Sequence, residues 1–136
     1  TQLIHRLNQE RGQILQEFIP LKYDIRVIVV AGKIHGAMKR PVPSGDFRSN
    51  VHQGSKPENI TLTEMERMEI ETVMKAMKPR GGWIGIDLIP SEDREKERPY
   101  VLEVNTQPGT VGYNTIIEGD ILKDVLKTFM NRDNWT

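Results

Sequence analysis

Two polar side chains interrupt an otherwise apolar stretch in YVLEVNTQPG. The stretch begins as a strand and ends in a turn, and side chains alternate between the two faces of a strand. We therefore expect Val101, Glu103 and Asn105 on one face, with Leu102 and Val104 on the other. Residues two apart lie about 7 Å apart by Cα, so Glu103 and Asn105 can reach one common ion.

Asp87 interrupts a second apolar strand, WIGIDLI, in the same way. A hairpin between the two strands would place Asp87 opposite Glu103 if their register allows it. Two carboxylates and an amide on a half-buried face repel and lose solvation, which costs several kcal/mol unless a cation joins them. All-oxygen ligands select Mg²⁺ or Mn²⁺, and Mg²⁺ completes its shell with phosphate oxygens and water. The pattern of Asp87, Glu103 and Asn105 thus predicts a metal site that meets a nucleotide.

Structural ion pairs are the alternative use of these acids. Asp87 and Glu103 could each pair with an arginine such as Arg26 or Arg48. Spacing alone does not decide between the metal site and the ion pairs.

A local excess of positive charge precedes these strands. Residues 33–56 are rich in glycine, serine and proline and contain a single acid, Asp46. The same segment contains five basic residues: Lys33, Lys39, Arg40, Arg48 and Lys56. Arg48 offers a planar fork for phosphate oxygens, and Ser49 and Asn50 add short polar donors. A solvated loop is the plain alternative, whereas nucleic acid is poorly supported because the segment has one aromatic residue and no basic helix.

The elements that must position these residues form a mixed pattern. Apolar spacing predicts helices over 1–12, 61–78 and 119–130, strands over 13–20, 83–89 and 100–104, a hairpin over 24–40, and irregular chain over 41–59. Thr63 and Glu66 predict a capping box at the start of the second helix. In the last helix a single apolar stripe is expected to dock on the sheet: Ile121, Leu122, Val125, Leu126 and Phe129. Together these elements predict an α/β (α+β) layer structure. We expect a mostly antiparallel sheet with flanking helices on one side of it.

Composition narrows the function classes. The 136 residues hold 19 basic and 19 acidic side chains and 37% hydrophobic residues, which indicates one globular domain without a field that would attract nucleic acid or a membrane. The sequence has no cysteine, which favours a reducing cytoplasm, and no apolar run long enough to span a bilayer.

In order, the motifs QEFIP, DIRVIVV, GDFRSN, GIDLI and YVLEVNTQPG resemble the C-terminal half of an ATP-grasp domain of the RimK type, the ribosomal-protein glutamate ligases and their relatives. The resemblance runs from about Gln16 to Asn114. It implies that residues 1–136 form a single domain, the C-terminal subdomain of that fold, with the upstream half absent from this sequence. The missing half would carry lysines and a glycine-rich flap that hold the phosphates.

The resemblance also implies roles for individual residues. The adenine would bind along the backbone of a hinge strand, and the nucleotide site as a whole would comprise Glu17, Phe18, Ile19, Asp24, Arg48, Ser49 and Asn50. Asp24 would lie on the ribose side. Two Mg²⁺ or Mn²⁺ ions would bind Asp87, Glu103 and Asn105, with Glu103 bridging them, and Arg48 and Asn105 would serve catalysis.

The chemistry implied by the resemblance is carboxylate–amine ligation. An acid attacks the terminal phosphate of ATP to give an acyl phosphate, and an amine, from an amino acid or peptide, then displaces phosphate. Two other readings stay open: an ATP-grasp kinase, and a non-catalytic nucleotide-binding or scaffold module. The upstream half, or a second copy of the chain, is a further expected partner.

Overall fold

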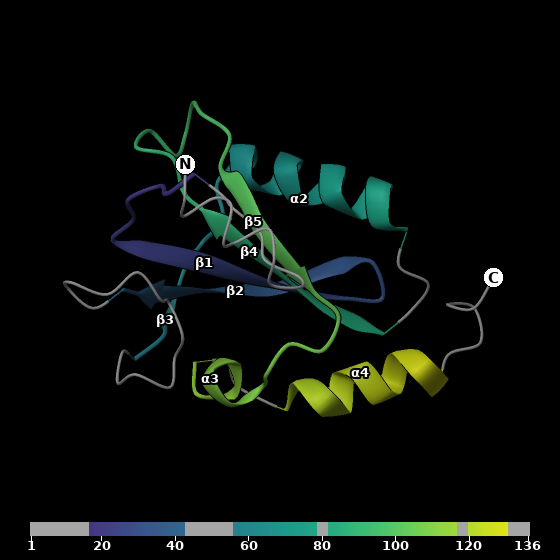
Figure 1. The fold of residues 1–136 in the computed structure, drawn as a ribbon. Coiled ribbons are helices and arrows are strands. Elements are labelled where there is room, and N and C mark those ends of the chain that lie inside the picture. Colours follow the sequence, from purple (N-terminus) through teal and green to yellow (C-terminus); the bar gives the residue numbers. More distant parts are fainter. Residues whose placement is uncertain (1–16, 43–55, 79–81, 117–119, 131–136) are drawn as a thin grey trace, which may run out of the picture.

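The computed structural model describes residues 17–42, 56–78, 82–116 and 120–130. There, one antiparallel sheet has the strand order β3-β2-β1-β4-β5 (Figure 1). The strands are β1 (Tyr23–Val30), β2 (Lys33–Pro41), β3 (Glu58–Asn59), β4 (Trp83–Ile89) and β5 (Tyr100–Asn105), and the helices are α2 (Glu64–Met77), α3 (Val111–Asn114) and α4 (Ile121–Met130). The expected sheet and both hairpins, β1–β2 and β4–β5, are confirmed.

Helices cover both faces of the sheet, so the expectation of helices on one side is wrong (Figure 1). α2 packs on one core, built from Ile25, Val27, Val29, Ala37, Leu62, Ile70, Ile84, Ile86 and Leu88. α3 and α4 pack on the other, built from Ile28, Val30, Met38, Tyr113, Ile121 and Val125. The near-continuous apolar run of β1 explains this, because both sets of its alternating side chains need cover from water.

The capping box predicted for α2 is confirmed. The backbone N–H of Glu66 donates to Thr63 Oγ1 at 3.3 Å, and the backbone N–H of Thr63 donates to Glu66 Oε2 at 2.9 Å. Among the described residues, no helix is both long and apolar enough to cross a membrane.

The β4–β5 register places Asp87 directly opposite Glu103, as expected. One step later the register shifts, and Leu88 pairs with Val101, which leaves Leu102 as the extra residue of a β-bulge. Directly paired residues share a face of the sheet. Val101 therefore lies on the face of Leu88, and the expectation that it shares a face with Glu103 is wrong.

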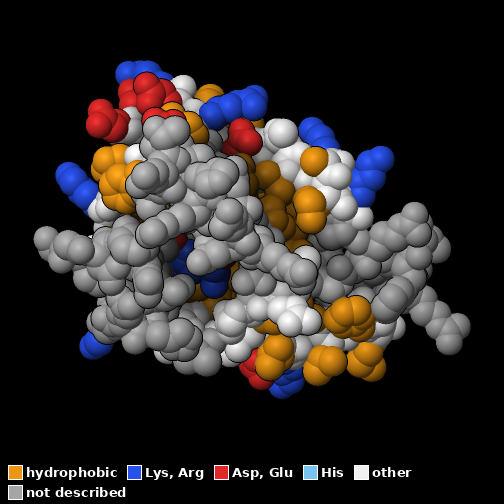
Figure 2. Space-filling view, in the orientation of Figure 1, with side chains coloured by type: hydrophobic (Ala, Val, Ile, Leu, Met, Phe, Trp, Pro, Cys, Tyr) orange, Lys and Arg blue, Asp and Glu red, His pale blue; other side chains and the backbone are white. Residues whose placement is uncertain are grey.

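The apolar stripe of α4 docks only in part. Ile121 and Val125 are buried, whereas Leu122, Leu126 and Phe129 are 45%, 61% and 42% exposed. Figure 2 shows hydrophobic side chains on the surface at the lower edge, where α4 lies. The helix meets the sheet through positions four apart, which brings a single row of side chains into the core and leaves the neighbouring row outside.

Several expected elements fall wholly or partly outside the described residues. The first helix lies outside, as does most of the irregular segment, in which Glu58–Asn59 forms a short strand. Of the strand expected over 13–20, the described residues 17–20 have no regular structure, so that expectation is wrong for them.

Candidate functional site

A row of charged side chains crosses the sheet on the face opposite α2. It follows the cross-strand pairs: Asp24 on β1 pairs with Arg40 on β2, Arg26 on β1 pairs with Asp87 on β4, and Asp87 pairs with Glu103 on β5. Strand alternation creates this row, since Ile25 and Val27 point into the α2 core and leave the residues between them for the other face.

Two arginines hold Asp87. Arg26 donates from Nε to Asp87 Oδ1 at 2.7 Å and from Nη2 to Oδ2 at 2.6 Å, and Arg40 donates from Nη2 to the same Oδ2 at 2.7 Å. Arg26 Nη2 also lies 3.5 Å from Glu103 Oε1. Arg26 thus forms the ion pairs that the alternative expected, which does not by itself decide against a metal, while Arg48 lies outside the described residues.

Asp24 is fully buried and engages Arg40 with both oxygens. Arg40 Nε donates to Oδ1 at 2.7 Å and Nη2 donates to Oδ2 at 2.5 Å. Asp24 thus orients Arg40 in the structure. The expected contact of Asp24 with a ribose stays a prediction. Although burial opposes the charge, the hydrogen bonds and charges of Asp24 and Asp87 raise the pKa of Arg40.

The pKa values of the two facing carboxyls move in opposite directions. Burial alone would raise the pKa of Asp87, but the hydrogen bonds and charges of Arg26 and Arg40 outweigh it and lower that pKa. Burial and the nearby charge of Asp87 raise the pKa of Glu103, and the arginines oppose this only weakly. The neighbours of Asp87 thus favour its ionised form, whereas burial and Asp87 oppose the ionised form of Glu103.

The donor set suits a hard divalent cation. Asp87 on β4 is paired with Glu103 on β5. Two residues along each strand, Gly85 is paired with Asn105, so Asn105 lies on the same face of the sheet as Asp87 and Glu103. An ionised carboxylate has about four acceptor positions, and the arginines use three on Asp87. Two carboxylates plus an amide fit Mg²⁺, which takes few protein ligands and completes its shell with phosphate and water. In the described ranges, no three or more His, Cys, Asp or Glu side chains form a metal-binding group, so a site here would need the Asn105 amide as its third ligand.

Asn105 is oriented by the turn that follows it. The backbone N–H of Gln107 donates to Asn105 Oδ1 at 2.8 Å. Pro108 packs over Gly85, where an added Cβ would lie 2.9 Å from Pro108 Cβ and 3.7 Å from Arg26 Nε. The turn therefore adjoins the charged row.

The expected nucleotide residues are only partly visible. Glu17 and Phe18 are exposed and Ile19 is half-buried, all in irregular chain. Arg48, Ser49 and Asn50 lie outside the described residues. The structure brings together Asp24, Asp87, Glu103 and Asn105, and it leaves the contribution of the other residues a prediction.

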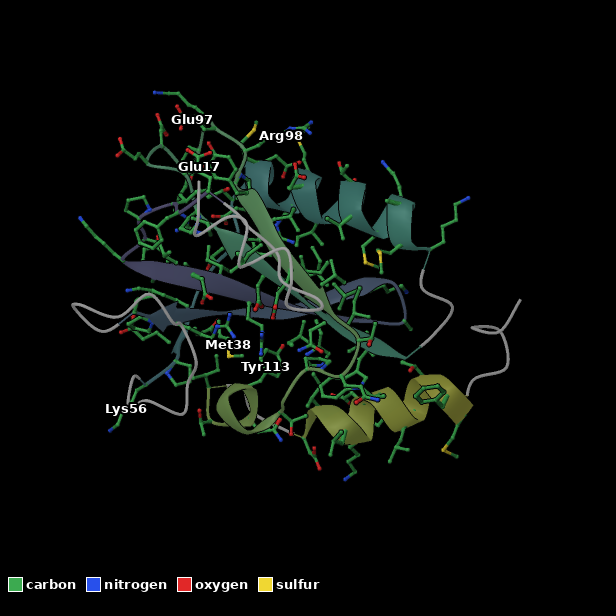
Figure 3. The ribbon with its side chains drawn as sticks, in the orientation of Figure 1. Glu17, Met38, Lys56, Glu97, Arg98 and Tyr113 are labelled. Atoms are coloured by element: carbon green, nitrogen blue, oxygen red, sulfur yellow. The ribbon has the colours of Figure 1, made fainter. Side chains whose placement is uncertain are left out.

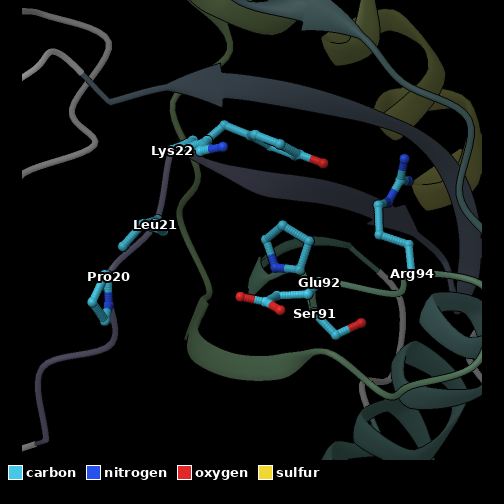
Figure 4. A pocket seen from close by; sticks show the side chains of 8 residues that line it. Pro20, Leu21, Lys22, Ser91, Glu92 and Arg94 are labelled. Carbon is cyan, nitrogen blue, oxygen red and sulfur yellow. The ribbon is translucent and has the colours of Figure 1, made fainter.

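A pocket of about 440 Å³ lies beside the start of β1 (Figure 4). Its lining residues come from the chain before β1, from the first residue of β1 and from the loop after β4: Pro20, Leu21, Lys22, Tyr23, Pro90, Ser91, Glu92 and Arg94. Tyr23 packs on the α2 core, and Arg94 binds Glu66 of α2. None of the lining residues belongs to the charged row.

Sequence reasoning missed the place of Arg40. It counted Arg40 among the cations that would meet an anion, yet the side chain is buried between Asp24 and Asp87. Lys39 of the same segment is also engaged, 3.0 Å from Glu58 Oε2 and 5.0 Å from the centre of the Tyr23 ring. A sequence signal existed only for Arg26, a charged residue between the apolar Ile25 and Val27 of a strand, because Arg40 lies between Lys39 and Pro41.

Comparison with curated proteins finds ligases among the relatives of this chain. Probable alpha-L-glutamate ligases from Maridesulfovibrio salexigens and Psychromonas ingrahamii are 37% and 42% identical to this chain, over 82% and 75% of its length. The aligned part is 36% and 32% of those relatives, so the chain spans about a third of their length.

Solved structures show the same fold. The D-alanine–D-alanine ligase of Bacillus anthracis complexed with ATP matches with a TM-score of 0.57 at 19% identity, over 86% of this chain and 40% of the other. The ATP-grasp ligase PsnB, complexed with a phosphomimetic variant of its minimal precursor, Mg and ADP, has a TM-score of 0.57 at 18% identity, over 82% and 32%. The family model of the RimK-like ATP-grasp domain matches residues 1–129, and the chain belongs to that family.

Proposed function

We propose that this chain is the ATP- and metal-binding part of an ATP-dependent carboxylate–amine ligase. The observation that carries the proposal is the placement of Asp87, Glu103 and Asn105 on one sheet face, with Asp87 directly opposite Glu103. Membership of the RimK-like ATP-grasp domain family and the glutamate ligase relatives support the reaction class. A cytoplasmic location is part of the proposal, supported by a sequence without cysteine.

In this proposal Asp87, Glu103 and Asn105 hold two Mg²⁺ or Mn²⁺ ions through oxygen atoms. The ions would supply neutralisation of the phosphate charge during transfer. Arg40, fixed by Asp24, and Arg26 keep Asp87 ionised and oriented, so that it meets the cation without rearrangement of the sheet. Arg48, Ser49 and Asn50 bind phosphate, and the backbone of 17–19 borders the adenine.

The proposed reaction has two steps. A carboxylate oxygen of the acid attacks the terminal phosphorus of ATP, and ADP leaves. The amine nitrogen then attacks the acyl carbon, inorganic phosphate leaves, and the nitrogen loses its proton. The amine would be that of an amino acid or a peptide, and the turn after Asn105 would border it.

An activity assay of a full-length ligase that includes this chain tests the reaction. With ATP, Mg²⁺, a glutamate-bearing acid and hydroxylamine, we expect a hydroxamate and one inorganic phosphate for each ADP. A kinase would form ADP and a phosphorylated product without releasing phosphate. ADP formation with no hydroxamate and no phosphate release for any acid and amine would reject the ligase.

A further inference from the structure

We propose that Tyr113 and His35 form a positioning lock that fixes the turn 106–112 and, through that turn, the carboxamide of Asn105. The part that concerns Asn105 rests on the proposed function, because it assigns this amide to the metal. The lock itself lies on β2, α3 and α4, outside the row of charges described above.

A β-bulge aims His35 at Tyr113. Ile28 pairs with Gly36 and Val29 pairs with Ile34, so His35 is the extra residue of β2. Bulges redirect side chains. His35 Nδ1 lies 2.8 Å from Tyr113 Oη, and its Nε2 lies 3.3 Å from Asp124 Oδ2.

One neutral form of His35 satisfies both contacts. The Tyr113 hydroxyl donates to Nδ1, and Nε2–H donates to Asp124, which also accepts from Lys127 Nζ at 2.8 Å. Tyr113 is fully buried, and this burial raises its pKa to about 12, so it keeps the proton that it donates. His35 therefore ties together α3, α4 and the sheet.

Packing alone does not require a tyrosine here. Phenylalanine would fill the same space between α3 and β2, where Figure 3 shows Tyr113 near Met38. A hydroxyl that is buried without a partner destabilises a fold, so its presence marks the bond to His35 as the specific feature.

Two glycines hold the ends of this segment close to the sheet. A Cβ on Gly36 would collide with the Tyr113 hydroxyl, and a Cβ on Gly85 would lie 2.9 Å from Pro108. Gly109 lies between these two contacts and has nothing within 4 Å of its Cβ position. The turn is thus anchored at Pro108 and at Tyr113, and its third fixed point is the bond from Gln107 N–H to Asn105 Oδ1.

Tyr113→Phe is the test, because it deletes the hydroxyl and keeps the ring. We expect amide hydrogen exchange in the turn 106–112 to accelerate about fivefold, as for the loss of one hydrogen bond, while exchange in α2 is unchanged. His35→Leu should accelerate exchange in the same turn by a similar factor. Thr72→Val is the matched control, since it removes a hydroxyl bond to Met68 O at 2.9 Å within α2 and should leave exchange in the turn 106–112 unchanged.

Mn²⁺ binding in the presence of ATP, followed by electron paramagnetic resonance, tests the link to Asn105. Tyr113→Phe should weaken Mn²⁺ binding several-fold in the parent chain and have no further effect in an Asn105→Ala background, because coupled residues are not additive. A merely structural tyrosine would weaken both backgrounds equally.

The outcomes are separable. If the parent binds Mn²⁺–ATP and the variants at Tyr113 and His35 match it in exchange and affinity, the lock is rejected and the proposed function stands. Absence of binding by the parent would remove the proposed function, and this role of the lock with it.

Discussion

The two carboxyls that face each other in this sheet differ in how they are held. Asp87 is buried and accepts three arginine hydrogen bonds, whereas the Glu103 side chain is 55% exposed and lies 3.5 Å from one arginine. Removal of one partner from a buried ion pair is strongly destabilising, while exposed pairs contribute little. The same deletion of charge should therefore destabilise the fold strongly at Asp87 and only slightly, if at all, at Glu103.

We predict that Asp87→Asn lowers the free energy of unfolding by about 3–5 kcal/mol in metal-free buffer, because Arg26 and Arg40 lose their shared anion. Glu103→Gln, in the same buffer, should change that free energy by less than about 1 kcal/mol. Urea unfolding of both variants and the parent in chelator measures this. Equal losses at the two positions would show that Glu103 is a structural partner like Asp87.

The pH dependence of these variants follows from the two pKa directions. The lowered pKa of Asp87 stabilises the fold above the ordinary value of about 3.9, and this contribution is lost only as pH falls through the still lower folded pKa. The raised pKa of Glu103 has the reverse sign: its ionised form opposes folding, and the opposition disappears as pH falls through that raised value.

We therefore predict that any advantage of Glu103→Gln over the parent shrinks as pH falls from 7 toward the ordinary Glu value of about 4.3. The deficit of Asp87→Asn should persist over the same range. Thermal melts of the three proteins across this range provide the check. A Glu103→Gln difference that does not change with pH would contradict the raised pKa.

At the scale of elements, the charged loop between β4 and β5 is tied to the start of α2. Arg94 donates from Nε to Glu66 Oε1 at 2.7 Å and from Nη2 to Glu66 Oε2 at 2.9 Å, and Thr63 Oγ1 donates to the Arg94 carbonyl at 2.9 Å. Glu66 is almost fully buried and also closes the capping box. This bond network gives the loop a structural role that its sequence did not reveal.

We predict that Arg94→Ala lowers the free energy of unfolding by about 3 kcal/mol, because it leaves the buried Glu66 without its cation. Arg98→Ala is the matched control: Arg98 comes from the same loop, is half-exposed and lies 3.5 Å from Glu69 Oε2, so its loss should cost less than about 1 kcal/mol. Similar unfolding midpoints for the two variants would mean that the loop does not support α2.

The predictability of each element depended on how local its cause is. The capping box of α2 and the β1–β2 hairpin were readable because neighbouring residues determine them. The bulges at Leu102 and His35 were not, since each arises only when two strands are paired, and they redirect Val101 and His35. The same holds for Arg40, whose partners Asp24 and Asp87 lie 16 and 47 residues away.

At the scale of the whole molecule, the sheet presents one face to α2 and divides the other between two uses. Near the start of β1 that face carries the charged row, and toward its end Ile28 and Val30 support α3 and α4. The turn after β5 joins the two regions, because Asn105 begins it and Tyr113 follows it. The positions of the candidate metal ligands thus depend on the pairing of β4 with β1 and β5, and, in the proposal above, on the packing of α3 and α4.

The chain covers about a third of its glutamate ligase relatives, so its own testable property is ligand binding rather than turnover. A thermal melt of the parent and of Glu103→Gln, each in chelator and in Mg²⁺–ATP, tests the central claim most directly. We expect the parent to gain about 2.7 kcal/mol at a hundredfold excess of ligand over its dissociation constant, and Glu103→Gln to lose most of that gain while melting like the parent in chelator. A variant that melts lower in chelator and still gains fully from Mg²⁺–ATP would contradict the assignment of Glu103 to the metal.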